Sequence, residues 1–363
     1  YCANVSFGRP FSRGPVFSLA NWSATSKSRQ IAGFAQIDWQ FLPKATLTAG
    51  GRVQNEAVSY TFLDRQANNA FYSGHAEDTA GTYKVNLRYE FTPDLMLFGT
   101  YATGYKGQTY DLTTGFNLNR ALAGPIKPER SRDREIGART QFFDRRLTLN
   151  LTLFDTDYTN LQAQSIETLA DGTQNYRLTN VGGLKTRGIE LEGSARLGGD
   201  VTFGGAVTYL DAHYTDYAIA QCYPMQTLAQ GCSGSPARQN LTGGRAIQAP
   251  EWKFTISGDY SPALTDKLRG IAQFNWQYQS SLNFGLRDPE TFQSAYHIVN
   301  VGLGVRDADH RWEVVGFVNN LFDQQYFASL VNTAGNFGNQ QATQALLPRD
   351  FRRYGGVRLS VNF

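Results

Sequence analysis

The last seven residues of the chain, VRLSVNF (357–363), have the pattern of a β-strand that lies between two different environments. Apolar and polar side chains alternate along it: Val357, Leu359, Val361 and Phe363 against Arg358, Ser360 and Asn362. Successive side chains of a strand point to opposite faces, so one face of this strand is apolar and the other polar. A soluble domain seldom ends in this way, because chain termini usually fray into water.

The composition allows a membrane protein, but one that crosses with strands. The chain has 363 residues, 36 of them Gly, with 13% aromatic and 18% charged residues. The mean hydropathy of −0.39 and the lack of any apolar run near 18 residues exclude a transmembrane helix. A transmembrane strand needs only about ten alternating residues. The net charge of +3, without a Lys/Arg tract, argues against a nucleic-acid partner.

One unit recurs along the chain: an alternating run, a tight polar turn, a second alternating run and a long irregular loop. This order is typical of a meander of hairpins. The short turns are LPKA (42–45), TPDL (92–95), FDRR (143–146), LGGD (197–200), SPALTDK (261–267) and RDADH (306–310). The long loops are predicted near 61–81, 107–127, 166–175, 215–248, 280–293 and 327–350.

Long strands favour a membrane barrel over a soluble β-sandwich. The runs 129–142 and 178–197 are each well past the usual five or six residues of a strand. Four aromatic residues lie where an interfacial girdle is expected beside the short turns: Trp39, Tyr89, Trp252 and Trp312. We therefore predict an all-β, transmembrane, antiparallel up-and-down barrel of about thirteen strands. Its short turns would be periplasmic and its long loops extracellular.

The cysteines indicate an oxidising compartment. Cys222 and Cys232 bracket a polar segment rich in turn-forming residues, which favours a disulfide between them and leaves Cys2 over. Zinc binding is the rival interpretation, but two thiols without a CxxC spacing or an intervening His make a poor site.

No pattern in the sequence indicates an enzyme, a cofactor or a metal site. The four histidines are scattered, and the motifs HExxH and GxSxG are absent. An outer-membrane hydrolase would need a His beside Ser or Asp at the barrel rim. His213 near Asp211 is the one weak candidate, and its position at the end of a strand is more often structural.

Five segments resemble, in the same order, motifs of TonB-dependent outer-membrane receptors. They are LFGTYATGYKGQTYDL (97–112), PERSRDREIGART (128–140), NVGGLKTRGIELEGSARL (180–197), VNNLFDQQYFAS (318–329) and PRDFRRYGGVRLSVNF (348–363). The resemblance covers most of the chain. It implies a bacterial outer-membrane location, contact with outer-membrane lipid, and active uptake of a bulky, scarce ligand energised by the TonB complex.

The resemblance also implies that residues 1–363 are the C-terminal portion of a larger, plugged barrel. Large transporters of this class have 22 strands and a plugged lumen. The energy-coupling box, the plug and the first barrel strands have no counterpart near the start of this chain. The strand near 29–41 and the last strand would then both be open edges, which cannot face lipid unpaired.

A ferric siderophore is the ligand that the resemblance favours. Vitamin B12, haem and oligosaccharides are alternatives within the same family. A passive porin is the rival from another class, and it would need an open, charged lumen.

Two groups of residues are given functional hypotheses. Aromatic faces and cations suit an anionic, aromatic iron chelate, and one segment offers both: Tyr105, Lys106, Tyr110, Phe116 and Arg120. An aromatic girdle is the structural alternative for Tyr105 and Tyr110. The resemblance further implies that the barrel-assembly machinery reads the terminal strand, through Val357, Leu359, Val361 and Phe363, with this apolar face toward lipid.

Overall fold

The computed structural model describes residues 22–65, 68–113, 116–168, 174–235, 237–332 and 342–362. Cys2 and Phe363 lie outside the described residues. Among these residues, no helix is long and apolar enough to cross a membrane.

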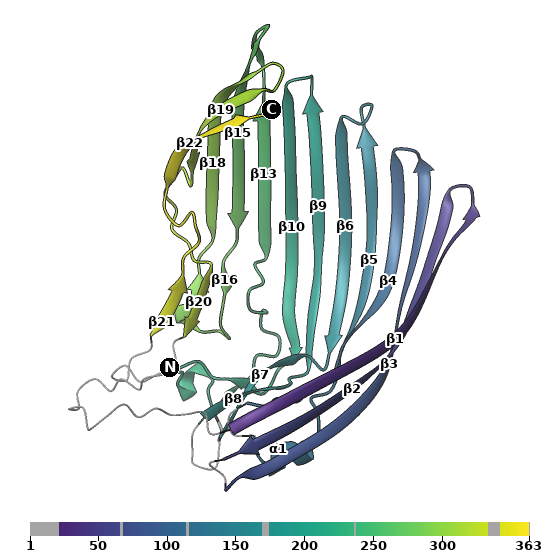
Figure 1. Ribbon diagram of the computed structural model, residues 1–363, viewed down its shortest axis with the longest axis vertical. Coiled ribbons are helices and arrows are strands. Elements are labelled where there is room, and N and C mark those ends of the chain that lie inside the picture. Colours follow the sequence, from purple (N-terminus) through teal and green to yellow (C-terminus); the bar gives the residue numbers. More distant parts are fainter. Residues whose placement is uncertain are drawn as a thin grey trace, which may run out of the picture.

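Most strands form one large antiparallel sheet, which curves like the wall of a wide trough (Figure 1). Its strands, in sheet order, are β1 (Trp22–Leu42), β2 (Ala45–Asp64), β3 (Ala70–Thr92), β4 (Leu95–Lys106), β5 (Glu129–Phe142), β6 (Leu147–Thr159), β9 (Gly183–Leu197), β10 (Val201–Asp216), β13 (Trp252–Tyr260), β15 (Leu268–Gln279), β18 (Tyr296–Asp307), β19 (Trp312–Asn319) and β22 (Tyr354–Val361), with β14 (Ala263–Thr265) paired to β15 beside this path. In the described part of the chain the sheet therefore has the thirteen consecutive strands that the turn spacing predicts.

Smaller elements lie in the long connections. They are α1 (Leu118–Ala123), the 3₁₀ turns η1 (Leu228–Gln230) and η2 (Pro289–Thr291), and the short strands β7 (Gln162–Thr168), β8 (Gln174–Asn180), β11 (Ala220–Gln221), β12 (Arg238–Gln239), β16 (Leu282–Asn283), β17 (Phe292–Gln293), β20 (Ser329–Asn332) and β21 (Thr343–Leu346). Asn117 caps α1 by accepting a hydrogen bond from the Arg120 amide, at 3.1 Å.

Short turns and long loops lie at opposite ends of the sheet, as the alternation of turn lengths predicts (Figure 1). The turn after β5 holds three successive non-glycine residues in the left-handed region, Phe143, Asp144 and Arg145, with φ between 54° and 65°. The end of β22 lies with the short turns, which is where the predicted periplasmic rim would be.

Two predicted boundaries are wrong. Residues 61–81 are not one long loop, because β2 continues to Asp64 and β3 begins at Ala70. The run 178–197 is not one strand, because the chain turns at Gly182 between β8 and β9. Gly182 has φ +104°, and a Cβ atom there would lie 2.3 Å from the Asp216 carbonyl oxygen, so only glycine fits this corner.

The two faces of the sheet differ as the alternation predicts. In β6, the side chains on one face are those of Leu147, Leu149, Leu151 and Leu153, and in register across β9 the same face continues with Leu191 and Ile189. In β22, Val357, Leu359 and Val361 are 74%, 66% and 50% exposed. We call this apolar surface the outer face, because an apolar band on a membrane barrel faces lipid.

Three of the four predicted girdle aromatics lie beside short turns, and the fourth does not. Trp39, Tyr89 and Trp312 are within a few residues of the short turns. Trp252 is the first residue of β13 at the opposite end, where its ring packs at a tilt against Tyr209 with centroids 4.8 Å apart. The prediction that Trp252 lies beside a short turn is therefore wrong, because it lies at the loop end of the sheet.

The sheet has two open edges. In the described residues, β1 pairs with β2 alone and β22 with β19 alone. The edges that the sequence predicts are thus present, with the first strand beginning earlier than expected, at Trp22.

Candidate functional site

An aromatic cluster packs the loop after β4 against the C-terminal part of β2. Tyr60, Phe62 and Phe116 are buried, and the Phe116 ring lies 5.2 Å from that of Tyr60 and 4.9 Å from that of Phe62. Tyr110 packs on Tyr60 at 4.5 Å. Burial raises the pKa of the Tyr110 phenol, which therefore stays neutral. Phe116 and Tyr110, both predicted ligand contacts, are thus part of the packing that shapes this loop.

The other predicted contacts also have protein partners. The Tyr105 hydroxyl donates to Asp78 Oδ2 at 2.8 Å, and the Arg130 guanidinium lies 5.5 Å from the centre of its ring. Lys106 Nζ lies 3.7 Å from Glu129 Oε2, but its side chain is 58% exposed. Lys106 is the most accessible of the predicted cations.

Arg120 is buried beneath α1. Its side chain is 7% exposed and donates to Thr113 Oγ1 at 3.3 Å, with Asp111 Oδ2 at 4.0 Å. A buried, partnered guanidinium holds the loop in place more readily than it meets a ligand. The structure thus gathers the five predicted residues around one loop, and Lys106 is the exposed one among them.

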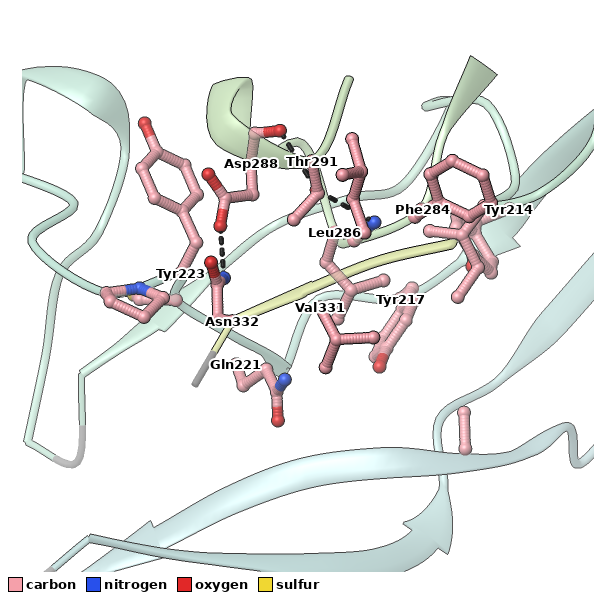
Figure 2. A pocket seen from close by; sticks show the side chains of 16 residues that line it. Tyr214, Tyr217, Gln221, Tyr223, Phe284, Leu286, Asp288, Thr291, Val331 and Asn332 are labelled. Atoms are coloured by element: carbon pink, nitrogen blue, oxygen red, sulfur yellow. Dashed lines mark hydrogen bonds between the residues drawn. The ribbon is translucent and has the colours of Figure 1, made fainter. Parts of the chain in front are cut away.

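A second feature at the loop end is a cavity of about 530 Å³ that sequence reasoning missed (Figure 2). Its walls come from the loops after β10 and β15 and from β20. Its lining residues are Ala163, Tyr214, Tyr217, Gln221, Cys222, Tyr223, Pro224, Ile247, Phe284, Gly285, Leu286, Asp288, Thr291, Leu330, Val331 and Asn332. The residues lie far apart in the sequence, so no local motif could have indicated the cavity.

The disulfide stiffens one wall of this cavity. Cys222 and Cys232, the pair that the sequence predicts, are joined with an S–S distance of 2.05 Å. The buried Gln239 amide then links two loops, because its Nε2 donates to the Gln221 carbonyl at 2.7 Å and to the Leu286 carbonyl at 2.9 Å. A covalent bond therefore holds one wall of the cavity, and hydrogen bonds of Gln239 connect that wall to the loop of Leu286.

Both polar and aromatic groups line the cavity. The Asn332 amide donates to Asp288 Oδ2 (Figure 2). Asp288 Oδ1 also accepts from the Glu290 amide at 3.0 Å. Tyr217, also in the lining, is buried against Tyr214, with ring centroids 4.9 Å apart. Burial raises the pKa of the Tyr217 hydroxyl. Such a surface suits a compact ligand with both aromatic and polar groups.

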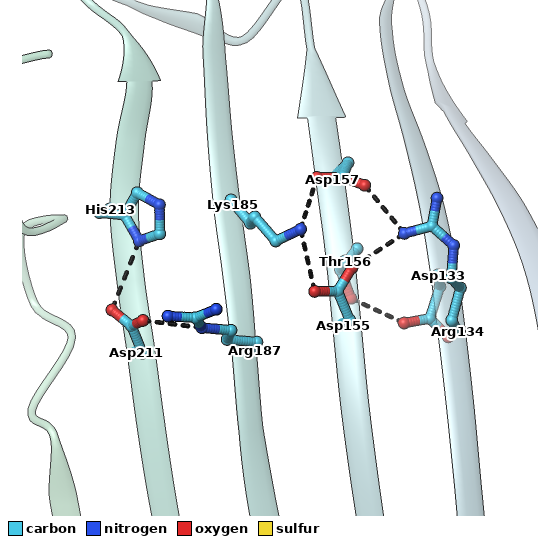
Figure 3. A network of polar contacts seen from close by, with 9 residues as sticks. All are labelled: Asp133, Arg134, Asp155, Thr156, Asp157, Lys185, Arg187, Asp211 and His213. Carbon is cyan, nitrogen blue, oxygen red and sulfur yellow. Dashed lines mark hydrogen bonds and ion pairs between the residues drawn. The ribbon is translucent and has the colours of Figure 1, made fainter. Parts of the chain in front are cut away.

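The weak enzyme candidate does not face this cavity. His213 Nδ1 lies 3.4 Å from Asp211 Oδ1, and Arg187 Nε donates to the same carboxyl group at 2.9 Å (Figure 3). In β10 both residues follow Val207 and Tyr209 on the outer face. In the described residues, no group of three or more His, Cys, Asp or Glu side chains could hold a metal ion.

Known proteins with similar sequences are receptors for iron chelates. The chain is 24% identical over 325 residues to the ferric-pyoverdine 358 receptor of Pseudomonas putida, which covers 89% of this chain and 35% of that protein. It is also 24% identical over 326 residues to the ferrichrome outer membrane transporter/phage receptor of Escherichia coli K12, covering 86% and 36%. The chain thus spans about a third of the length of these relatives.

Solved structures share the fold. The ferric yersiniabactin uptake receptor of Yersinia pestis matches with a TM-score of 0.72 at 17% identity, covering 94% of this chain and 47% of that one. The siderophore receptor PiuA of Acinetobacter baumannii matches with a TM-score of 0.67 at 20% identity, covering 93% and 43%. The family described as TonB-dependent receptor-like β-barrel matches residues 3–321. The chain therefore belongs to the β-barrel family of TonB-dependent outer-membrane receptors, which are transport receptors and not enzymes.

Proposed function

We propose that this chain is part of an outer-membrane receptor that binds a ferric siderophore and imports it with energy from the TonB complex. The observation that carries the proposal is the walled cavity of aromatic and polar side chains at the loop end of a barrel of this family. The printed names of its relatives, receptors for ferric pyoverdine and ferrichrome, favour the same class of ligand.

We further propose that residues 1–363 form the C-terminal portion of the barrel domain. Two open sheet edges support this, since edges cannot face lipid unpaired. The one-third coverage of the relatives is consistent with it. In the complete receptor, further strands would cover β1, a plug would fill the lumen, and the barrel-assembly machinery would read the terminal strand.

Iron uptake by a deletion strain tests the proposed transport. The complete gene is deleted and restored on a plasmid, and ⁵⁵Fe uptake is measured from a panel of purified ferric siderophores, ferrichrome and pyoverdine included. We expect at least one chelate to enter only when both the gene and an intact TonB system are present. Uptake that continues without TonB, together with rapid solute leakage in liposome swelling, would instead support a passive porin.

Substitutions in the cavity test where the ligand binds. Tyr223→Ala removes an aromatic side chain from the wall of the cavity, and Tyr260→Ala is the matched control on the outer face near a short turn. We expect weaker chelate binding for Tyr223→Ala and unchanged binding for Tyr260→Ala, with equal folded amounts. Lys106→Ala tests the other loop in the same assay. If all three variants bound the chelate with the affinity of the unmodified receptor, neither the loop of Tyr223 nor the loop of Lys106 would be part of the binding site.

A further inference from the structure

A ladder of charged side chains crosses four strands of the outer face (Figure 3). Two rows in register form it: Arg134, Asp155, Arg187 and Asp211, and next to them Arg132, Asp157, Lys185 and His213, on β5, β6, β9 and β10. We call these eight residues the charged ladder. In each row, cations and carboxylates alternate from strand to strand, apart from His213 in the last place.

Ion pairs connect the middle of the charged ladder. Arg134 Nη1 contacts Asp155 Oδ1 at 2.8 Å and Asp157 Oδ2 at 3.0 Å. Lys185 Nζ reaches the same two carboxylates, at 3.0 and 3.4 Å. Arg187 pairs with Asp211 at 2.9 Å. The pairs fix the side chains on neighbouring strands, so the positions of the cations are set before any ligand arrives.

The charged ladder lies where the apolar band ends on the loop side. One row nearer the short turns, Leu153 pairs in register with Ile136 and Ile189 on the same face. The stretch from Leu147 at the short turn to Asp155 has nine residues, close to the 9–11 residues that a tilted transmembrane strand needs. The charged ladder therefore sits at the level of the outer-leaflet headgroups.

Cationic donors remain available on this surface. Arg132 is exposed, and in the described part of the chain its guanidinium has no ion pair or hydrogen bond. Arg187 pairs with Asp211 through Nε, and Arg134 pairs through Nη1, so in the described residues their other nitrogens make no ion pair or hydrogen bond. Four cations against three carboxylates leave the charged ladder with an excess positive charge when His213 is neutral.

An apolar groove lies below the charged ladder on the same strands. It has a volume of about 320 Å³ and is centred where two small residues meet, Gly193 of β9 and Gly205 of β10. Leu149, Leu191 and Ile256 form its sides. From Arg187 to Gly193 the distance along the strand is about 20 Å. A charged site above and an apolar groove below match the two parts of a lipid molecule.

We propose that the charged ladder binds the phosphate of a membrane lipid whose acyl chain lies in the groove at Gly193 and Gly205. Guanidinium groups donate paired hydrogen bonds to phosphate oxygens, so Arg132, Arg134 and Arg187 form the phosphate site. The acyl chain of the lipid occupies the apolar groove. The site lies outside the lumen, so it is separate from the loop cavity and independent of the imported ligand.

Binding of phosphatidic acid to the complete, purified receptor tests this proposal. Dipalmitoyl phosphatidic acid is titrated in detergent and bound lipid is counted by native mass spectrometry, with dipalmitoylglycerol as the probe without phosphate. Removal of one cation near an anionic headgroup weakens binding about fivefold. We expect this loss for Arg132→Gln, and a larger loss when Arg187→Gln is added. Dipalmitoylglycerol should bind weakly to every variant.

Two further variants separate a lipid site from a purely structural ladder. Asp157→Asn removes a competing carboxylate and should tighten phosphatidic acid binding, whereas a structural ladder predicts no gain. Arg139→Gln removes a cation from the other face of β5 and should change nothing. Equal binding by Arg132→Gln and the unmodified receptor would overturn the proposal. Full displacement of the lipid by millimolar inorganic phosphate would also overturn it, because the site would then take free phosphate.

Discussion

Asp323 accepts two hydrogen bonds from the guanidinium of Arg352, at 3.0 Å from Nε and 2.8 Å from Nη2. It also accepts from the backbone amide of Arg353, at 2.7 Å. Asp323 follows β19 and Arg352 precedes β22, so this bidentate pair joins the loop ends of the last two strands. The segments 318–329 and 348–363, which resemble family motifs separately, are thus joined by this pair, and Asn320 and Tyr326 add hydrogen bonds to Asp350.

Asp323→Asn should lower the melting temperature at neutral pH and have little effect in strong acid. The Arg352 guanidinium holds the pKa of Asp323 below its ordinary value. An unfolded Asp has a pKa of about 3.9. The stabilisation is therefore present above about pH 4 and is lost as the pH falls through the lower, folded pKa. Circular dichroism gives the melting temperatures of the variant and the unmodified protein at pH 7 and pH 2. The same difference in melting temperature at the two pH values would contradict the prediction.

Phe116→Ala should loosen the loop after β4 without unfolding the barrel. Removing a buried phenylalanine costs about 3–5 kcal/mol, and here the cost falls on the cluster with Tyr60 and Phe62. Hydrogen exchange of residues 109–126 should become faster, while the barrel strands keep their protection. Leu122→Ala, on the exposed side of α1, is the control. If chelate binding fell while protection stayed unchanged, Phe116 would be a direct ligand contact.

Removal of the disulfide by Cys222→Ser and Cys232→Ser should act on the cavity wall. The bridged residues are 10 apart in the chain, and closing so short a loop contributes about 3 kcal/mol to local stability. We expect faster hydrogen exchange in residues 220–239 and weaker chelate binding, with normal barrel assembly. Non-reducing digestion of the unmodified protein should give one cross-linked peptide from this loop. Two alkylatable thiols in the folded receptor would contradict the pairing.

Leu359→Lys should reduce assembly of the complete receptor far more than Ser360→Lys. The Leu359 side chain is on the outer face, where a lysine costs about 2–4 kcal/mol near the bilayer midplane and less toward its edges. Ser360 faces the other way and pairs in register with Glu313, which would stabilise a lysine. The amount of heat-modifiable folded band in outer-membrane fractions measures the difference. Equal assembly of the two variants would exclude an outward-facing Leu359.

The sequence predicts the membrane-spanning part of the sheet well, because there the two sides of each strand meet different environments. In β6, leucines alternate with Thr and Asn, and the run 129–142 has the bounds of β5. Turn-forming residues such as the Gly198–Gly199 pair then mark where one strand ends and the next begins. The period of two and the short turns together specify the order of the hairpins.

The same reasoning fails where both sides of a strand meet water or other loops. Residues 61–81 carry polar side chains on both faces, since β2 and β3 continue past the membrane, so they resemble a loop in composition. The loop cavity was missed for a different reason. Its walls come together only through tertiary contacts, such as the hydrogen bond between Gln239 and Leu286. A short sequence motif does not indicate contacts between residues so far apart in the chain.

The unequal height of the barrel wall has a consequence for what reaches the cell surface first. β2 has 20 residues, about twice what crosses a membrane, whereas β19 and β22 have eight each. The surplus lengthens β2 by about 30 Å along the strand, while the cavity with Asp288 and Asn332 belongs to the loops of other strands. A large molecule that approaches from the loop end is therefore expected to contact the projecting ends of β1, β2 and β3. A small molecule can pass beside these ends to the cavity.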